Sequence, residues 1–247
     1  MAYLVRGLIL SALIYLAVVG AVYHAMHQPP ETFARRISGL PRVLLYDLLP
    51  FYRMWVSARR GPLRPGNPAP DFDVASVAPQ GRARLTDFRG RPLLLLFGSY
   101  SSPALRGEVA EFNQMHRDYR DRVAILLIYL HEAHSVDGWQ LQENVDDEVL
   151  VRDHASMDER LAAARQAIGL LKIEFPVAVD SFDNRTERAY TAWPARAYLI
   201  NSEGRIARKG PPGPFALNSS RLEAILKRLL ESKKAESPKE HARIGMP

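Results

Sequence analysis

The chain contains no cysteine among its 247 residues. Disulfides, thiolate metal sites and dithiol redox cycles all need a thiol, so this absence excludes all three within the chain. It leaves the compartment open, because a protein without thiols is compatible with any redox poise. The hydrophobic content of 47% is ordinary for a globular protein, so a membrane signal has to be local.

Such a local signal lies near the N-terminus, where Gly7 to Met26 form a run of 20 residues without formal charge. A helix of about this length crosses the roughly 30 Å hydrocarbon core of a bilayer. We therefore predict a single-pass membrane anchor over residues 1–28. A cleaved signal peptide is the alternative, because Arg6 precedes the run and Val19-Gly20-Ala21 offers small residues to a peptidase. The length of the run and the basic segment behind it favour the anchor.

The net charge of +6 is concentrated behind this run. Residues 31–65 contain two acidic residues and seven arginines, namely Arg35, Arg36, Arg42, Arg53, Arg59, Arg60 and Arg64. Arginines that follow the span favour a cytoplasmic domain under the positive-inside rule. The rest of the chain is close to balanced, which argues against nucleic-acid binding.

Residues 29–66 are predicted to form a basic juxtamembrane segment and a proline-rich linker. Aromatic and apolar residues alternate with the arginines, which suits an amphipathic segment lying on anionic lipid. A connector helix packed on the following domain explains the same pattern, and the sequence leaves both interpretations open. Prolines at positions 62, 65, 68 and 70 then prevent a helix from continuing.

From Asn67 the pattern predicts an α/β domain over residues 67–230. Continuous apolar runs are typical of strands that are buried on both faces. We expect strands at 71–74, 82–85, 93–97, 123–130, 176–179, 197–200 and 205–209. Helices are expected over 105–116, from Ser156, which stands three residues before Glu159 in capping-box spacing, and from Ser220. Residues 231–247 are charged and small and are predicted to be disordered.

The most informative stretch is Phe97-Gly98-Ser99-Tyr100-Ser101-Ser102-Pro103, where an expected strand leads through a turn into a helix. It is similar to Phe-Gly-Ser-Cys-Thr-Sec-Pro, a signature of the iodothyronine deiodinases. The run from Leu127 to Trp139 resembles the Tyr-Ile-Glu-Glu-Ala-His…Asp-Gly-Trp run of that family. The stretches 67–72 and 85–90 resemble the opening of redoxin and peroxiredoxin domains and alone indicate only that broad superfamily. Further stretches at 158–165, 177–184, 192–198 and 209–214 match the deiodinases in the family's order. On these motifs the chain is identified as a member of the deiodinase family over about residues 67–230.

The resemblance implies a thioredoxin-like fold, with a central mixed sheet flanked by helices and preceded by an N-terminal transmembrane helix. It also implies reductive removal of iodine from an aromatic ring, regenerated by an external thiol and without a bound cofactor or metal. By position, the resemblance places Ser102 where the family has its nucleophile, and it implies that Ser99, Glu132 and His134 form a proton relay. The implied substrate-binding residues are Tyr100, Ser101, His154 and Pro194, the last as a cis-proline. A homodimer is implied by the family alone.

Serine at position 102 departs from the family pattern in a way that matters chemically. A thiol ionises near pH 8.5, and a helix N-terminus lowers that pKa further. A serine hydroxyl stays protonated and is too hard a nucleophile to attack iodine. Tyr100 also replaces the family's second cysteine, so a resolving thiol is missing. An engineered replacement of Cys or Sec would leave the same Ser102, but the absence of every other cysteine favours a native thiol-free chain.

Two hypotheses about function follow. In the first, the protein is an oxidoreductase-family member that acts on iodinated or phenolic aromatics, impaired by Ser102. In the second, it is a membrane-anchored pseudoenzyme that uses its pocket for binding or scaffolding.

Three weaker interpretations concern individual side chains. A serine hydrolase would combine Ser102 with His134 and Glu132, but no Gly-x-Ser-x-Gly elbow is present. His131 and His134 are too few for a metal site without a third ligand. Trp139 and Trp193 suit either an aromatic pocket or the core.

Overall fold

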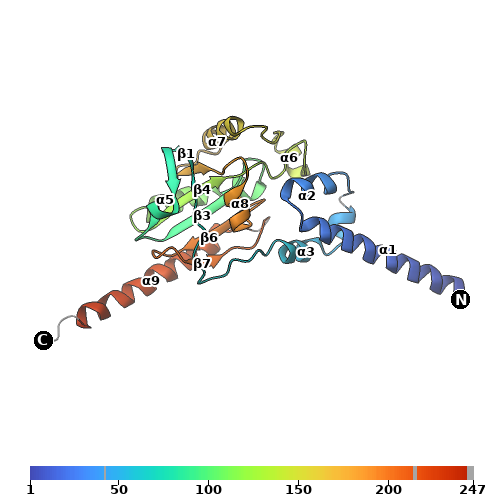
Figure 1. Cartoon of the computed structure of the whole chain (residues 1–247), viewed down its shortest axis with the longest axis horizontal. Helices are drawn as coiled ribbons and strands as arrows, with labels where there is room; N and C mark the ends of the chain where they lie inside the picture. Colours follow the sequence, from blue (N-terminus) through green and yellow to red (C-terminus); the bar gives the residue numbers. More distant parts are fainter. Residues whose placement is uncertain (42, 214–215, 244–247) are drawn as a thin grey trace.

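The computed structural model describes residues 1–41, 43–213 and 216–243, with side chains as far as residue 231. A sheet of seven strands has the order β2-β1-β5-β4-β3-β6-β7 (Figure 1). The strands are β1 (Asp73–Ala78), β2 (Gln80–Arg84), β3 (Leu93–Gly98), β4 (Ala124–Tyr129), β5 (Val177–Val179), β6 (Arg196–Ile200) and β7 (Ile206–Lys209). All seven expected strands are present, with bounds shifted by a few residues.

Three parallel strands form the centre of the sheet, since β3 pairs with β4 and β4 with β5 in that sense. On the other side, β3 pairs antiparallel with β6, which forms a hairpin with β7. A β-α-β unit followed by a β-hairpin and a helix is the thioredoxin-like arrangement, as the sequence predicts. The sheet is mixed and flanked by helices.

The central strand β3 is buried on both faces because alternate side chains point to opposite sides of the sheet. Leu94 and Leu96 join a cluster with Phe112, beneath helices α4 (Pro103–Arg106), α5 (Val109–Tyr119), α7 (Met157–Leu171) and α9 (Ser219–Arg243). Leu95 and Phe97 face the opposite cluster, which includes Tyr190 of α8 (Arg185–Tyr190). The continuous apolar run at 93–97 is explained by this double burial. The 3-10 helix η2 (Leu85–Phe88) and the short helix α6 (Gln142–Asp146) complete the domain, and a linker without regular structure precedes β1.

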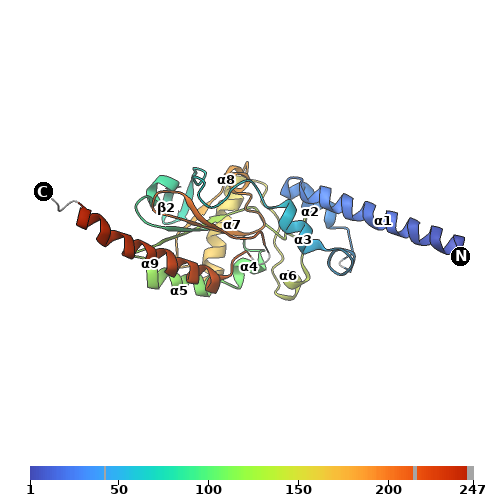
Figure 2. The ribbon, with the colours of Figure 1, turned by 90° about the horizontal axis from the view of Figure 1, so that it is seen from below.

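Helix α1 (Ala2–Met26) projects away from the domain at the end opposite α9 (Figures 1 and 2). It is long and apolar enough to cross a membrane, with a mean hydropathy of 2.2 over its most apolar window. That window is almost entirely exposed, so α1 is not a core helix of the domain. Its last turns alone are buried, at Val22, Ala25 and Met26.

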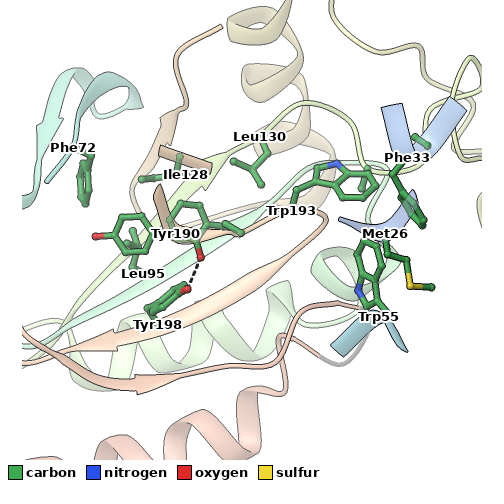
Figure 3. Packing of buried hydrophobic residues seen from close by; sticks show 14 of the residues in the cluster. Met26, Phe33, Trp55, Phe72, Leu95, Ile128, Leu130, Tyr190, Trp193 and Tyr198 are labelled. Carbon is green, nitrogen blue, oxygen red and sulfur yellow. Dashed lines mark hydrogen bonds between the residues drawn. The ribbon is translucent and has the colours of Figure 1, made fainter. Parts of the chain in front are cut away.

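The juxtamembrane segment packs onto the domain. It forms α2 (Pro30–Ile37), the π-helix η1 (Val43–Leu48) and α3 (Phe51–Ala58). Phe33 and Trp55 lie beside Trp193, with ring centroids 6.3 and 6.0 Å from it (Figure 3). Arg196 of β6 also donates a hydrogen bond to the Arg59 carbonyl at 2.6 Å. The α2 and α3 parts of this segment therefore pack against the domain, as the connector interpretation has it.

The C-terminal helix α9 continues to Arg243, where the sequence predicts a disordered tail from residue 231. Lys, Glu and Ala, which have high intrinsic helix propensity, make up most of the extension, whereas Pro238 lacks the backbone N–H that a helix interior needs. A helix already started on the domain is extended by such residues without needing a core contact, because nucleation is the costly step. Residues 244–247 of the expected tail lie outside the described residues.

Candidate active site

The turn between β3 and α4 presents Ser102 at the N-terminus of a short helix. The Ser102 carbonyl accepts hydrogen bonds from the backbone N–H groups of Leu105 and Arg106, at 3.0 and 3.1 Å. Pro103 occupies the first helical turn, where a missing N–H costs nothing. Ser102 itself is buried. The expected strand–turn–helix is therefore present, with Ser102 as its helix cap residue.

Ser102 lies on the wall of a cavity of about 630 Å³. His134, from the loop after β4, and Pro194, from the turn before β6, line the same cavity. The Trp193–Pro194 peptide bond is cis, as the resemblance implies. The juxtamembrane segment contributes Tyr46, Phe51, Tyr52 and Trp55 to the lining. Aromatic side chains and the three domain residues thus border one space that is large enough for a small aromatic molecule.

The protonation of His134 follows from its contacts. Its Nδ1 lies 3.0 Å from the Trp139 carbonyl oxygen. A carbonyl oxygen accepts but never donates, so Nδ1 carries the proton and Nε2 keeps its lone pair. Burial lowers the pKa of His134 to about 4. The imidazole is therefore neutral at pH 7, and its Nε2 is a proton acceptor.

Glu132 lies behind the cavity wall in a fully buried hydrogen-bond network. Its carboxylate accepts the Ser101 backbone N–H at 2.8 Å and the Tyr129 hydroxyl. His154 Nε2 lies 3.4 Å from the same carboxylate. Burial alone would raise the pKa of Glu132, but the nearby His154 ring and the hydrogen bonds from Ser101 and Tyr129 outweigh it and lower that pKa. Glu132 is therefore an anion within this buried network.

Asp153 holds the backbone of Glu132 and His154 in this network through its carboxylate. One carboxylate oxygen accepts the backbone N–H groups of Glu132 and His154, both at 2.9 Å. The other oxygen lies 3.4 Å from His131 Nδ1. Burial would raise the pKa of Asp153, but the nearby His131 ring and the two backbone N–H groups lower it to about 2.

The site residues named from the sequence divide into two sets. Ser102, His134 and Pro194 line the cavity, whereas Glu132, Ser99, Ser101, Tyr100 and His154 lie outside its lining. Ser99 and Ser101 accept backbone N–H groups of Ala133 and His134 through their hydroxyl oxygens, both at 3.0 Å. These two serines therefore hold the loop that carries His134.

In its simplest form, the expected proton relay would join Ser102, His134 and Glu132 by direct contacts, and the structure differs from this arrangement. Among the described residues, no hydrogen bond or ion pair joins Glu132 to His134 or Ser102 to His134. Glu132 instead contacts His154, for which the resemblance implies a role in substrate binding. His154 is buried, and its ring lies 6.1 Å from that of Tyr129.

Several residues that build the site were missed by sequence reasoning. Tyr129 ends a buried apolar strand, so its hydroxyl gives no signal of a contact with Glu132. Asn144 donates to the carbonyl oxygens of Ser101 and His134, at 2.8 and 3.3 Å, and pins the two loops together. The one signal that the sequence offers for Asp153 is its place directly before His154, because a carboxylate next to a histidine commonly orients the ring.

The two tryptophans left open by the sequence take different places. Trp139 lines the cavity and packs edge-on against His134, with ring centroids 4.8 Å apart. Trp193 is 1% exposed and belongs to the core, where it stacks on His131. In the described part of the chain, no group of three His, Asp or Glu side chains is arranged to hold a metal ion.

Comparison with known proteins settles the family. A sequence profile described as iodothyronine deiodinase matches residues 50–230. The chain belongs to the iodothyronine deiodinase family. This deiodinase-family chain is 36% identical over 163 residues to a thyroxine 5-deiodinase of Gallus gallus, an alignment covering 65% of this chain and 61% of the relative. It is 30% identical over 164 residues to a type I iodothyronine deiodinase of Xenopus laevis, covering 66% and 63%.

The chain thus spans about 60% of the length of these relatives, at 61% and 63%. Solved structures add the fold alone. A hypothetical protein from Sinorhizobium meliloti 1021 aligns with a TM-score of 0.51 at 18% identity, covering 70% of this chain and 87% of that one. An uncharacterized conserved protein from Geobacillus kaustophilus aligns with a TM-score of 0.50 at 17% identity, covering 70% and 85%.

Proposed function

We propose that this deiodinase-family protein binds an iodinated or phenolic aromatic molecule in the cavity, and that its reductive dehalogenation is impaired by Ser102. The observation that carries the proposal is the position of Ser102 on the cavity wall in a chain without a thiol. The aromatic wall of Tyr46, Phe51, Tyr52 and Trp55 supports the ligand class, because aromatic rings favour stacked and edge-on contacts.

Reductive dehalogenation needs a soft nucleophile at this wall. A thiolate would attack iodine to give an S–I bond, and the ring carbon would take a proton in place of iodine. An external thiol would then displace iodide from sulfur, and a second would release the protein thiol as a disulfide forms. A serine oxygen has no comparable route, so the site is expected to bind ligand and turn it over very slowly or not at all.

A second candidate function is a membrane-anchored binding or scaffolding module that carries out no reaction. The complete absence of cysteine favours it, since neither a nucleophilic nor a resolving thiol is available. The neutral His134 and the anionic Glu132 favour the first, because a nucleophile at position 102 would still find a proton acceptor in the same cavity.

We further propose that α1 anchors the protein in a membrane with the domain on the cytoplasmic side. Its exposed apolar surface supports the anchor, and the arginines that follow it support the orientation. Membrane lipid is then a partner of the N-terminal segment. The homodimer and the external thiol reductant implied by the family stay predictions.

The test compares iodide release by the full-length protein and its Ser102→Cys variant in detergent, with an iodinated phenol and dithiothreitol. We expect no iodide release from the wild type and slow, thiol-dependent iodide release from Ser102→Cys. Ala104→Cys is the matched control, because Ala104 lines the same cavity and its thiol would stand at the wrong position. Turnover by the wild type would contradict the proposed role of Ser102.

Ligand binding is measured separately through Trp139, which lines the cavity. Iodine quenches indole emission on contact, so the iodinated phenol should quench wild-type fluorescence more than the same phenol without iodine. Binding without turnover by Ser102→Cys would favour the binding module. The absence of saturable quenching would contradict the proposed ligand class.

A further inference from the structure

One hydrogen bond places the π-helix η1 at the level of the middle of α1. The Tyr15 hydroxyl donates to the Leu48 carbonyl at 3.0 Å. The side chains of α1 are exposed from Ala2 to Ala17, whereas Val18 and Val19 are half-buried against the core and Val22 is buried. The part of α1 that is free to contact lipid therefore ends near Ala17 on the domain side. Tyr15 lies two residues before that end, about 3 Å along the helix axis.

The segment tied to Tyr15 carries apolar side chains that do not pack into the domain. Val43 is 60% exposed and Leu48 is 58% exposed. Tyr46 and Tyr52 are each nearly half exposed on the same segment. Arg35, Arg36 and Arg53 are exposed beside them in the sequence. Asp47, between Tyr46 and Leu48, is exposed as well, and its carboxylate has to face the headgroups. Apolar and tyrosine side chains mixed with charged residues are the composition of an element that lies in the headgroup region, with its apolar side about 5–10 Å deep.

The same segment forms the rim of the cavity. Tyr46, Pro50, Tyr52 and Arg53 line it and are exposed, whereas Ser102 lines it from the buried side. The exposed residues of the cavity lining therefore come from the segment that is hydrogen-bonded to α1.

We propose that residues 43–52 lie at the boundary between headgroups and acyl chains of the leaflet next to the domain, so that the cavity opens toward the bilayer. The partner is the lipid surface itself. This inference rests on the membrane anchor and on the cavity ligand proposed above. It deepens the latter, because a ligand that enters here is an apolar aromatic dissolved in lipid.

The continuity of this surface with α1 argues for lipid over a second protein copy. α1 offers its exposed apolar residues along its whole outer length, and η1 is bonded to it part-way along. Once α1 is in a membrane, η1 cannot be far from lipid.

The absence of cysteine makes a direct measurement simple, because one introduced thiol can be labelled uniquely. Full-length Leu48→Cys and Tyr52→Cys are labelled with an environment-sensitive fluorophore and reconstituted in phosphatidylcholine vesicles. Some vesicles contain lipids with a spin label near the top of the acyl chain. Leu170→Cys is the matched control, because Leu170 is 53% exposed on α7 within the domain.

We expect emission from positions 48 and 52 to shift to shorter wavelength and to be quenched by the spin-labelled lipid. Emission from position 170 should match that of a fluorophore in water and stay unquenched. Equal emission and quenching at all three positions would overturn the proposal. A blue shift at position 48 without quenching would also overturn it, because protein and not lipid would then cover the segment. No ligand is present, so the result is independent of whether the cavity binds an aromatic molecule.

Discussion

At the residue scale, the position of the family's nucleophile differs from the family's pattern by one side-chain atom, the oxygen of Ser102. Ser102 has the burial, helix position and cavity exposure that the family's nucleophile would need. Its surroundings are suited to proton transfer, since His134 is neutral and Glu132 is anionic. What is missing is an atom that ionises near neutral pH and bonds to iodine. The Ser102→Cys experiment therefore tests one atom in an otherwise assembled site.

His134 gives the molecule a predictable response to acid. Its pKa falls from 6.5 to about 4 on folding, because burial penalises the charged ring. Between these values the unfolded chain binds the proton and the folded one does not, so stability falls as the pH falls from 6.5 to 4. The full loss is on the order of 3 kcal/mol. His134→Asn retains a donor for the Trp139 carbonyl and should lose much less over this range.

Urea unfolding of both proteins in detergent at several pH values measures this difference. Asp153 does not contribute between pH 6.5 and 4. Its pKa is lowered from 3.8 to about 2, so its stabilising effect is lost only as the pH falls below 3.8. Wild-type and His134→Asn curves that run parallel from pH 6.5 to 4 would show that His134 is not the group responsible.

At the scale of elements, the sequence specifies most clearly those features that depend on local contacts. Helix α7 begins as its capping spacing predicts, with the Ser156 hydroxyl accepting the Glu159 N–H at 3.2 Å. Glu159 in turn accepts the backbone N–H of Ala155 at 2.7 Å, one residue before the expected position.

Removing this cap should have a measurable cost. We expect Ser156→Ala to lower the free energy of unfolding by about 1 kcal/mol, because an orphan N–H group loses its partner. Ser220→Ala is the control, since Ser220 is exposed in the first turn of α9. Thermal unfolding followed by circular dichroism compares the two. Equal midpoints for both variants would mean that the Ser156 hydroxyl is not a stabilising cap.

Contacts between distant segments were beyond the sequence for a physical reason. Tyr129 and Leu127 look alike as members of one apolar run, and only the folded chain shows the Tyr129 hydroxyl accepting the backbone N–H of Tyr100 at 3.1 Å. Phe33 and Trp55 suited either lipid or protein by their amphipathic pattern, and packing against Trp193 decided between them. The strands, in contrast, followed from patterns within a few residues, and the cis-proline at position 194 followed from the family resemblance.

At the scale of the whole molecule, the juxtamembrane segment and the domain share one core. All three tryptophans take part in the junction, with Trp55 on α3, Trp139 in the loop after β4 and Trp193 before β6. Their ring centroids lie 6.0 to 6.2 Å apart. The buried Arg59 guanidinium adds an ion pair with Glu187 of α8 at 3.4 Å. The cavity therefore depends on residues 43–55 as much as on the thioredoxin-like domain.

The shared core predicts that the junction and the domain unfold together. Phe33 is 1% exposed and contacts all three tryptophan rings, so Phe33→Ala should cost about 3–5 kcal/mol. Tyr52→Ala, which truncates an exposed neighbour, should cost far less. In detergent, tryptophan fluorescence reports the junction while far-ultraviolet circular dichroism reports the whole fold. Phe33→Ala should shift both midpoints equally. A shift in fluorescence alone would mean that residues 29–58 are a tether and that one cavity wall can detach while the domain stays folded.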